Sequence, residues 1–466
     1  MGARAVASVF AIGWRRTSSL FVLRALTASL FTPISKRLRS YAIEENFFEP
    51  KYGRLSCGSS IHSISSKSID SVTNGSHVYT RLLPCPEANS APRIEHLIVY
   101  EEGPVHDYIC KVLDLPPMFV ADLIDFGAVY YSLVCPQPPP TASEEELRVF
   151  KQFTAPSVLR NRLSIRGKTL RDAQRTFRVT SYHQNLEVGT YLRVHVHPKR
   201  FPRCYEVDWK SRILGVSESF VVLDKPAGVS VGGTTDNIVE SCANFVTRAL
   251  SLPEPLKLTH QIDNCTEGCV VLARNKEYCS TFHKKLRDKK VKKQYLALAA
   301  SPVPLGVISH YMRPGNHYPK IVSKEYVEGW HLCQLQVTEC KRVPWPEAPA
   351  REKLSIDDCG WPSAGSAYEC EISLITGKTH QIRAQLAACG APVIGDTVYT
   401  PAAIHAEKSP LETLKTDASA YEKELAVADW VSLHGREPKC GIGLQACRIS
   451  WDDARLAYQA GSPWWR

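Results

Sequence analysis

Hydrophobic residues in the second half of the chain recur in short runs, separated by polar and helical stretches. Strands are predicted where apolar residues run on or alternate with polar ones: residues 220–223, 270–273, 292–298, 368–375 and 444–447. The alternation is cleanest in the fourth of these, where one face carries Tyr368, Cys370, Ile372 and Leu374. The pattern predicts a mixed α/β (α+β) domain from residue 211 to residue 466.

Two stretches between these strands have the spacing of amphipathic helices: residues 277–290 and 379–388. The first has an apolar stripe that is predicted to pack on the core: Tyr278, Phe282 and Leu286. In the second, Ile382 and Leu386 are expected to face inward. Thr379 is expected to cap this helix, which places Arg383 in its second turn.

A smaller α+β domain is predicted from about residue 93 to residue 205. It begins with a helical pattern around four apolar residues: Val112, Leu115, Val120 and Ile124. Gly127 then marks a helix end before a short strand, and another strand is expected at residues 191–196. Residues 136–140 are rich in proline and residues 144–146 are acidic, so we interpret them as an inserted loop.

This smaller domain loosely resembles the RNA-binding module first known from a ribosomal protein of the small subunit. The match covers the turn at residues 123–129 and the pair Gly189-Thr190, which replaces the module's Gly-Asp. Asp122 and Asp125 stand where cations would favour RNA, so the module's basic helix face is largely missing. The alternative is an unrelated small α+β domain.

The chain before this domain has a different composition. Residues 1–43 contain no Asp or Glu, and their basic residues alternate with Ser, Thr, Ala, Leu and Phe. This composition is typical of an organelle transit peptide, the alternative being a disordered basic tail that binds nucleic acid. Residues 44–92 predict a linker whose Ser-rich stretch favours a plastid (chloroplast) over a mitochondrion. Further along, residues 343–366 and 401–429 break the pattern and are predicted to be surface inserts.

Charge and cysteine content narrow the class of protein. There are 57 Lys and Arg against 47 Asp and Glu, and the net charge of +10 is compatible with a polyanionic partner. No uncharged apolar stretch reaches about 18 residues, so no membrane-spanning helix is expected. The 16 cysteines are scattered, and Cys265 and Cys269 have no His or Cys partners at zinc spacing. Reduced thiols are therefore expected, with a metal site as the alternative.

Four segments of the larger domain carry candidate chemistry: residues 223–229 (LDKPAGV), 260–268 (HQIDNCTEG), 292–298 (KKQYLAL) and 374–383 (LITGKTHQIR), the last followed by Gly395-Asp396 and Tyr399. Asp263 stands in a polar loop that leads into a buried strand, where a carboxylate is well placed for a cleft or, alternatively, caps a turn. Taken together and in this order, the segments resemble the RluA-type pseudouridine synthases from residue 220 to residue 399.

The resemblance implies a mixed, largely antiparallel sheet flanked by helices, and an enzyme that isomerises uridine to pseudouridine in RNA without a cofactor or metal. It implies that Asp263 is the catalytic carboxylate, that Arg383 keeps it ionised, and that Tyr295 packs on the flipped uracil or assists proton transfer at carbon 5. Substrate contacts are expected from two groups: His260, Gln261, Thr266 and Lys378, and the lysines Lys284, Lys285, Lys289 and Lys290. The expected partner is rRNA or tRNA.

The chain departs from the family pattern at a few positions: Gln261-Ile262 replaces Arg-Leu, Glu267 replaces Ser and Lys378 replaces Arg. The family's Arg is thought to help occupy the space of the flipped base, so its loss bears on substrate insertion rather than on the carboxylate. Two alternatives stay open. One is a catalytically inactive RNA-binding protein on the same fold, and the other is a hydrolase that uses His260 together with Asp263.

Overall fold

The structure is a computed structural model that describes two large parts of the chain and several short segments. The described residues are 93–138, 144–160, 162–315, 319–357, 359, 361, 365–401, 403, 435 and 437–466. The predicted leader (1–43) and linker (44–92) lie outside them, as does nearly all of the predicted insert at 401–429. Within the described ranges no helix has the length and apolar character needed to cross a membrane.

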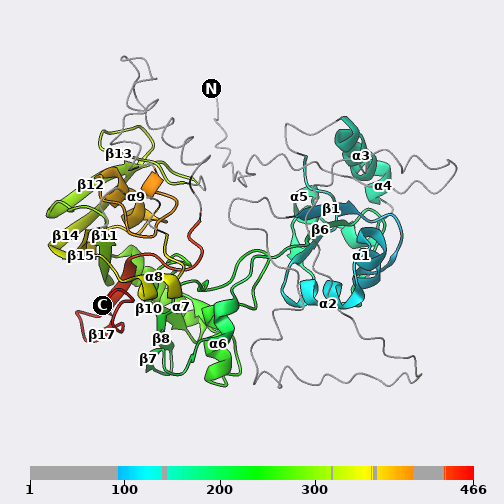
Figure 1. Ribbon diagram of the computed structural model, residues 1–466. Helices are drawn as coiled ribbons and strands as arrows, with labels where there is room; N and C mark the ends of the chain where they lie inside the picture. The colour runs from blue at the N-terminus through cyan, green and yellow to red at the C-terminus, as the bar shows by residue number, and fades with distance from the viewer. Residues whose placement is uncertain are drawn as a thin grey trace, which may run out of the picture.

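A four-stranded antiparallel sheet organises the N-terminal described part, drawn in blue to teal in Figure 1. Its strands are, in spatial order, β1 (Ile94–Ile98), β6 (Tyr191–His195), β3 (Val129–Ser132) and β4 (Phe177–Arg178). A two-stranded ribbon and five helices complete it: β2 (Gly103–Pro104) with β5 (Asn185–Leu186), α1 (Val105–Leu113), α2 (Pro117–Asp125), α3 (Glu144–Thr154), α4 (Pro156–Arg160) and α5 (Leu170–Ala173). Leu192 and Val194 face a core formed with α1 and α2, and β6 confirms the strand predicted at residues 191–196.

Two local features of this part differ from expectation. The single helical pattern is split into α1 and α2, because Asp114 adopts a left-handed φ of 52° and Pro117 starts a new helix. The acidic stretch beginning at Glu144 was predicted as a loop, and this is wrong, since it opens α3. Val149 and Phe153, four residues apart, pack against Ile98 and give that helix an apolar stripe.

The larger part is built on an 11-stranded sheet, ordered β13-β12-β14-β15-β11-β16-β10-β8-β7, with β17 paired to β16 and β9 paired to β10. The strands are β7 (Ile213–Val216), β8 (Phe220–Lys225), β9 (Lys257–Leu258), β10 (Glu267–Ala273), β11 (Lys292–Ala299), β12 (Gly306–Met312), β13 (Val322–Ser323), β14 (His331–Pro344), β15 (Ser366–Leu374), β16 (Leu444–Trp451) and β17 (Leu456–Gln459). The β10–β16 pair is parallel and the other pairs are antiparallel. The expected mixed, largely antiparallel sheet is confirmed.

Helices cover both faces of this sheet: α6 (Cys242–Ala249), α7 (Lys276–Arg287), α8 (Ala348–Lys353) and α9 (Gln381–Ala388). Along β8, Val221 and Leu223 pack in one core with α6, whereas Val222 packs in another with Phe282 of α7. Burial on both faces explains why β8 and β10 are continuous apolar runs rather than alternating ones. The stripe predicted for α7 is confirmed.

The start of α9 and one of the two inserts were predicted wrongly. Thr379 does not cap α9, because His380 takes a left-handed φ of 56° and the helix begins at Gln381, so Arg383 lies in its first turn. The side-chain carbonyl of Gln381 accepts the N–H of Lys378 instead. The stretch predicted as a surface insert at 343–366 contains β14 residues and helix α8, and it contributes three apolar side chains to a buried core: Leu354, Ile356 and Trp361.

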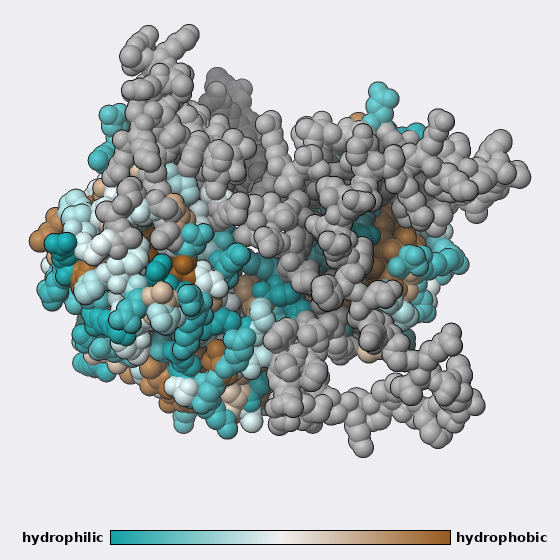
Figure 2. Space-filling view, viewed as in Figure 1, coloured by the Kyte–Doolittle hydropathy of each residue, from teal (hydrophilic) through white to brown (hydrophobic). Residues whose placement is uncertain are grey.

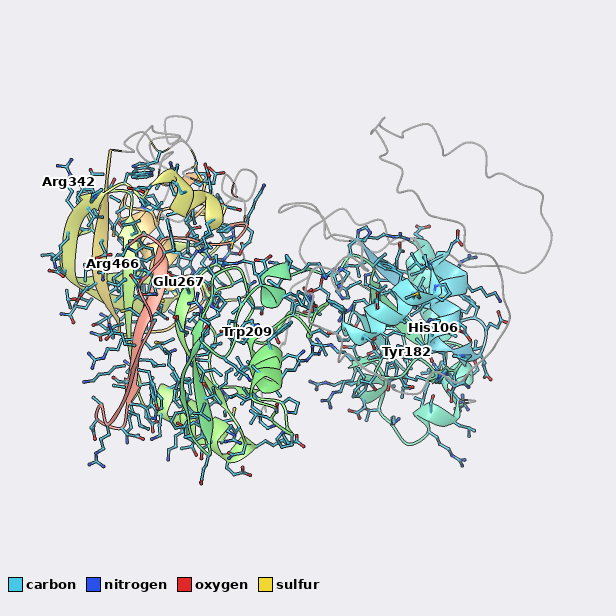
Figure 3. All side chains as sticks on the ribbon, turned by 60° about the horizontal axis from the view of Figure 1, so that its bottom comes forward. His106, Tyr182, Trp209, Glu267, Arg342 and Arg466 are labelled. Atoms are coloured by element: carbon cyan, nitrogen blue, oxygen red, sulfur yellow. The ribbon has the colours of Figure 1, made fainter. Side chains whose placement is uncertain are left out.

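The end of the chain is bound to the same sheet. Trp464 donates its indole N–H to the carbonyl of Ile442 at 2.9 Å, and Trp465 donates to the Glu369 carboxylate at 2.7 Å. Arg466 forms an ion pair with Glu369 as well, and Figure 3 labels Arg466 over the larger sheet. On the face shown in Figure 2, hydrophilic residues predominate over this part of the molecule.

Candidate active site

The loop between β9 and β10 brings Asp263 to the N-terminal end of α9. Nη1 of Arg383 donates to Oδ2 of Asp263 at 3.2 Å, although the two residues are 120 positions apart. The Arg383 side chain is 1% exposed, whereas the Asp263 side chain is 20% exposed. A ligand can therefore reach the carboxylate, while the cation stays buried behind it.

A second carboxylate, Asp396, holds Arg383 from the other side. Nε and Nη2 of Arg383 donate to the two oxygens of Asp396 at 2.7 and 2.9 Å, and the Asp396 side chain is fully buried. Burial by itself disfavours the guanidinium charge, but the negative charges of Asp396 and Asp263 raise the pKa of Arg383 well above its ordinary value. The fork geometry of this pair fixes the orientation of the remaining N–H group toward Asp263.

His380 and Tyr399 complete the surroundings of the guanidinium. Nε2 of His380 lies 3.2 Å from Nη1 of Arg383, and its Nδ1 lies 3.1 Å from Oη of Tyr399. Burial, together with the charge of Arg383, lowers the pKa of His380 to about 3. The imidazole is therefore neutral at physiological pH. Because Arg383 can only donate, Nε2 accepts from it and Nδ1–H donates to Tyr399.

Tyr295 projects from β11 into the core that also contains Cys265. Its ring is buried, and this burial, with a smaller contribution from the charge of Asp263, raises the pKa of its phenol. The phenol therefore stays protonated and neutral across the physiological range.

A buried lysine holds the loop that presents Asp263. The Lys225 side chain has no exposed surface, and its Nζ donates to the carbonyls of Pro226, Val229 and Asn264 at 2.9, 2.8 and 3.0 Å. The N–H of Gly228 donates to the same Asn264 carbonyl at 2.8 Å. Burial lowers the pKa of Lys225. The Asp-Lys-Pro-Ala-Gly turn thus positions the residue directly after Asp263.

Sequence reasoning missed four residues of this arrangement: Lys225, His380, Asp396 and Tyr399. All four belong to the quoted motifs, so their place in those motifs was the available signal. The short spacing between Asp396 and Arg383 does not reveal that they pair, because a loop separates Asp396 from α9.

The four motif residues that were predicted to contact the substrate fall into two groups, one packed in the core and one exposed. The ring of His260 stacks on Phe282, 6.1 Å between centroids, and its Nε2 accepts the N–H of Val271 at 3.1 Å. These contacts place His260 in the core, and Thr266 is also buried. A direct substrate contact by either side chain therefore conflicts with its packing. Gln261 and Lys378 are exposed and remain available to a ligand.

The predicted basic run lies at the C-terminal end of α7. Lys284, Lys289 and Lys290 are exposed, whereas Lys285 forms an ion pair with Asp452. Helix α7, which carries Lys284 and Lys285, packs through Phe282 against Trp451. None of these four lysines contacts the cluster around Asp263 among the described residues.

Glu267, which stands where the resembling family has Ser, is a buried carboxyl at the start of β10. Its Oε1 accepts the backbone N–H of Trp464 at 3.2 Å, which ties the end of the chain to the strand after Asp263. Burial raises the pKa of Glu267 to about 7. The folded state therefore favours the protonated form of this side chain.

Replacing Glu267 by Gln should change the pH dependence of stability. Between the ordinary carboxyl pKa of 4.5 and about 7, folded Glu267 holds a proton that the unfolded chain has lost. Stability of the wild type therefore falls as pH rises through this window. Glu267→Gln should be near neutral at pH 5 and stabilising by up to about 3 kcal/mol above pH 7.5.

Thermal melts from pH 5 to pH 8.5 measure this difference. Glu369→Gln is the matched control, since its ion pair with Arg466 helps to lower the pKa of Glu369 and its loss should destabilise at neutral pH. A Glu267→Gln variant whose melting temperature tracks the wild type at every pH would contradict the raised pKa.

The larger part of the chain has a recognisable enzyme class. Residues 219–388 match the family described as RNA pseudouridylate synthase. The matched range contains Asp263, Tyr295 and Arg383, whereas Asp396 and Tyr399 lie just beyond it.

Relatives extend the match over nearly the whole chain. The chain is 57% identical over 460 residues to RNA pseudouridine synthase 6, chloroplastic, of Arabidopsis thaliana, covering 95% of this chain and 98% of the relative. It is also 57% identical over 396 residues to the protein of the same name from Oryza sativa subsp. japonica, covering 84% and 83%. Among solved structures, human RNA Pseudouridylate Synthase Domain Containing 1 matches with 17% identity and a TM-score of 0.36, covering 54% of this chain and 82% of that one.

The chain therefore belongs to the RNA pseudouridine synthase family, whose members are isomerases that act on RNA. The resemblance noted in the sequence is confirmed, as is the chloroplast location, since both relatives are named chloroplastic.

Proposed function

We propose that the protein isomerises specific uridines in rRNA or tRNA, with Asp263 as the catalytic carboxylate. The observation that supports this assignment most is the contrast in burial across one ion pair, in which Asp263 is 20% exposed and Arg383 is 1% exposed. A carboxylate that accepts a hydrogen bond from a buried guanidinium is held in one orientation and yet remains open to a ribose.

The reaction breaks the bond from ribose carbon 1′ to base nitrogen 1 and forms a new bond from carbon 1′ to base carbon 5. Carbon 5 loses its proton and nitrogen 1 gains one, so the isomerisation is balanced without a redox step. Asp263 acts beside the sugar, either by attacking carbon 1′ or by removing the proton from carbon 2′. In both routes the carboxylate must be held at the sugar, and we assign to Arg383 the role of pairing with it and orienting it.

Tyr295 has a narrower role than proton transfer. Its phenol is protonated because burial raises its pKa, so it is a poor base for the proton at carbon 5. We assign it to packing against the extruded uracil. Extrusion costs a few kcal/mol and favours loops or deformed helices over regular duplex. Lys284, Lys289 and Lys290 add phosphate affinity at a distance from the base.

Incubation of the full chain with uridine-labelled rRNA or tRNA, followed by digestion to nucleosides, tests the proposal. Pseudouridine at defined positions supports it. Bound but unchanged RNA would assign the protein to an inactive RNA-binding role, and released fragments would assign it to a hydrolase.

The proposal also includes a role for residues 1–43 as the import signal. Fusing this segment to a fluorescent protein should direct the fusion to chloroplasts, because it lacks acidic residues and carries interleaved basic ones. Deleting it should leave activity on RNA in vitro unchanged. A fusion that stays in the cytosol would reject this role.

A further inference from the structure

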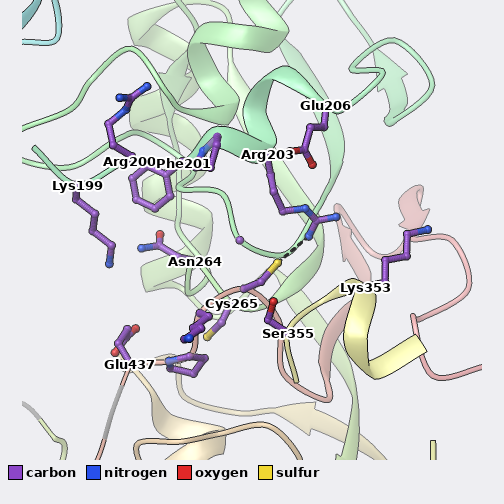
Figure 4. A pocket seen from close by; sticks show the side chains of 15 residues that line it. Lys199, Arg200, Phe201, Arg203, Glu206, Asn264, Cys265, Lys353, Ser355 and Glu437 are labelled. Carbon is purple, nitrogen blue, oxygen red and sulfur yellow. Dashed lines mark hydrogen bonds between the residues drawn. The ribbon is translucent and has the colours of Figure 1, made fainter. Parts of the chain in front are cut away.

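A pocket of about 320 Å³ opens beside the loop that carries Asp263 (Figure 4). Asn264 and Cys265, which directly follow Asp263, form part of its wall. Consecutive Cα atoms lie about 3.8 Å apart, so the pocket begins one residue from the proposed catalytic carboxylate. The volume falls at the lower end of the ~300–1,000 Å³ range of ligand pockets.

The rest of the wall comes from segments that are far apart in the sequence. One is the connection between the two sheets, residues 199–206, and the others include α8 with the turn after it and residues 437–440. Lys199 and Lys439 lie outside the range that matches the family, residues 219–388, and Lys353 lies in the stretch predicted as an insert. The pocket is thus built largely by parts of the chain that surround the family's common region.

The pocket has an excess of positive charge. Lys199, Lys353 and Lys439 are exposed, and none of them forms an ion pair with another described residue. Arg203 adds a fourth cation, and Glu206 and Glu437 are the acidic residues of the wall. Figure 4 shows the lysine and arginine side chains arranged around the opening. Arg200, the fifth cation of the wall, is not counted here because it forms an ion pair with Glu240.

That fifth cation belongs to a network that holds the connection in place. Arg200 donates to both oxygens of the buried Glu240, and the backbone N–H of Phe201 donates to the same carboxylate at 2.6 Å. Asp236 accepts the backbone N–H of Lys199 at 2.7 Å, and Asn237 donates to its carbonyl at 2.8 Å. Three polar side chains from one loop thus fix the backbone on either side of the pocket wall.

The same loop also contacts the smaller sheet. Arg178 donates to the carbonyls of Thr234 and Thr235 at 3.3 and 3.1 Å, and the N–H of Ile238 donates to the carbonyl of Phe126 at 2.9 Å. The loop joins β8 to α6 and reaches across between the two parts in Figure 1. The wall that carries Lys199 and Arg203 is therefore preorganised rather than a free linker.

We infer that this pocket binds a backbone phosphate of the RNA next to the uridine that lies at Asp263. The inference rests on the proposed function, because it takes the target nucleotide to lie at that carboxylate. Lysines supply point charges suited to phosphate, and fixing the backbone that carries Lys199 before RNA arrives reduces the entropic cost of binding. The site reads no base, so it sets the register of the strand and not its sequence.

The test is the affinity of the full chain for a fluorescein-labelled RNA hairpin with a single-stranded uridine loop, measured across salt concentrations. The triple variant K199A/K353A/K439A should raise Kd at least tenfold in 0.1 M salt. The slope of log Kd against log salt should fall by about 0.7 for each single-strand phosphate that the variant no longer neutralises.

Two matched triples control the measurement. Lys151, Lys210 and Lys276 are exposed lysines outside the pocket, and replacing them by Ala should leave Kd and slope near wild type. The triple Lys→Arg at the three pocket positions should also retain both. Equal Kd and slope for the two Ala triples would overturn the inference, as would Lys→Arg variants that bind as weakly as Ala ones.

Two further outcomes separate the pocket from its alternatives. If inorganic phosphate raises the melting temperature of the wild type and not of the pocket triple, while RNA affinity is the same in both, the pocket binds free phosphate and the inference is wrong. The salt dependence of binding does not depend on the chemical step. An Asp263→Asn enzyme that stays active would therefore reject the proposed function without changing the result for the pocket.

Discussion

Asp263→Asn should abolish pseudouridine formation while the protein keeps its fold and its affinity for RNA. The substitution is isosteric and removes only the charge. Arg383 can still donate to the amide oxygen, and Asp396 still holds the guanidinium through two hydrogen bonds. We expect single-turnover rates to fall at least a thousandfold, which corresponds to about 4 kcal/mol of transition-state stabilisation.

The measurement compares single-turnover isomerisation, RNA binding and thermal melts of the variant and the wild type. Asp288→Asn is the control, since Asp288 is an exposed carboxylate at the end of α7 and should tolerate the same exchange. A variant that turns over within tenfold of the wild type would show that Asp263 is not the catalytic group.

Arg383→Met should abolish activity and also destabilise the protein strongly. The substitution removes the partner of Asp263, and it deprives the fully buried Asp396 carboxylate of the two hydrogen bonds that the guanidinium donates. Breaking one side of a buried ion pair costs about 3–5 kcal/mol, because the remaining charge stays desolvated. The catalytic and structural effects of Arg383 therefore coincide in the single variant.

A double variant separates the two effects. Arg383→Met with Asp396→Asn removes the buried charge together with its partner, so much of the lost stability should return. Activity should stay absent, because Asp263 still lacks its cation. Melts and single-turnover rates of both single variants and the double variant complete the cycle. Activity that returns together with stability would show that Arg383 acts only on the fold.

The sequence predicts that Arg383 lies beside Asp263, and the structure brings the two side chains to 3.2 Å. This pairing could be predicted because each residue has a fixed position in an ordered set of motifs. The neutral state of His380 could not be predicted. Its pKa depends on burial and on the charge of Arg383, and neither is readable from the spacing of the two residues.

Strands were predicted well, and helix starts less well. The runs at 220–223 and 270–273 are apolar on both faces because α6 and α7 cover β8 and β10 from opposite sides. The start of α9 depends on the left-handed backbone of His380, which a Thr before a helix does not reveal. The core role of Leu354, Ile356 and Trp361 was hidden by the surrounding Pro and charged residues.

The contact between the two sheets could not be predicted at all. It depends on a loop at 232–240 whose polar residues have no periodic pattern, and three of them bind the backbone at residues 199–201. Long-range hydrogen bonds between a loop and a connection leave no signal in local sequence. They nevertheless fix the backbone that carries Lys199 in the pocket wall.

The central claim is that this site forms a bond from ribose to carbon 5 of uracil under the control of Asp263. Chloroplast rRNA or tRNA transcribed with uridine that carries tritium at carbon 5 reports that bond directly, since carbon 5 must release its hydrogen to solvent. We expect tritium release by the wild type, in step with pseudouridine formation at defined positions, and none by Asp263→Asn. Tritium release at the same rate by both proteins would contradict it, and so would RNA that stays fully labelled after prolonged incubation with the wild type.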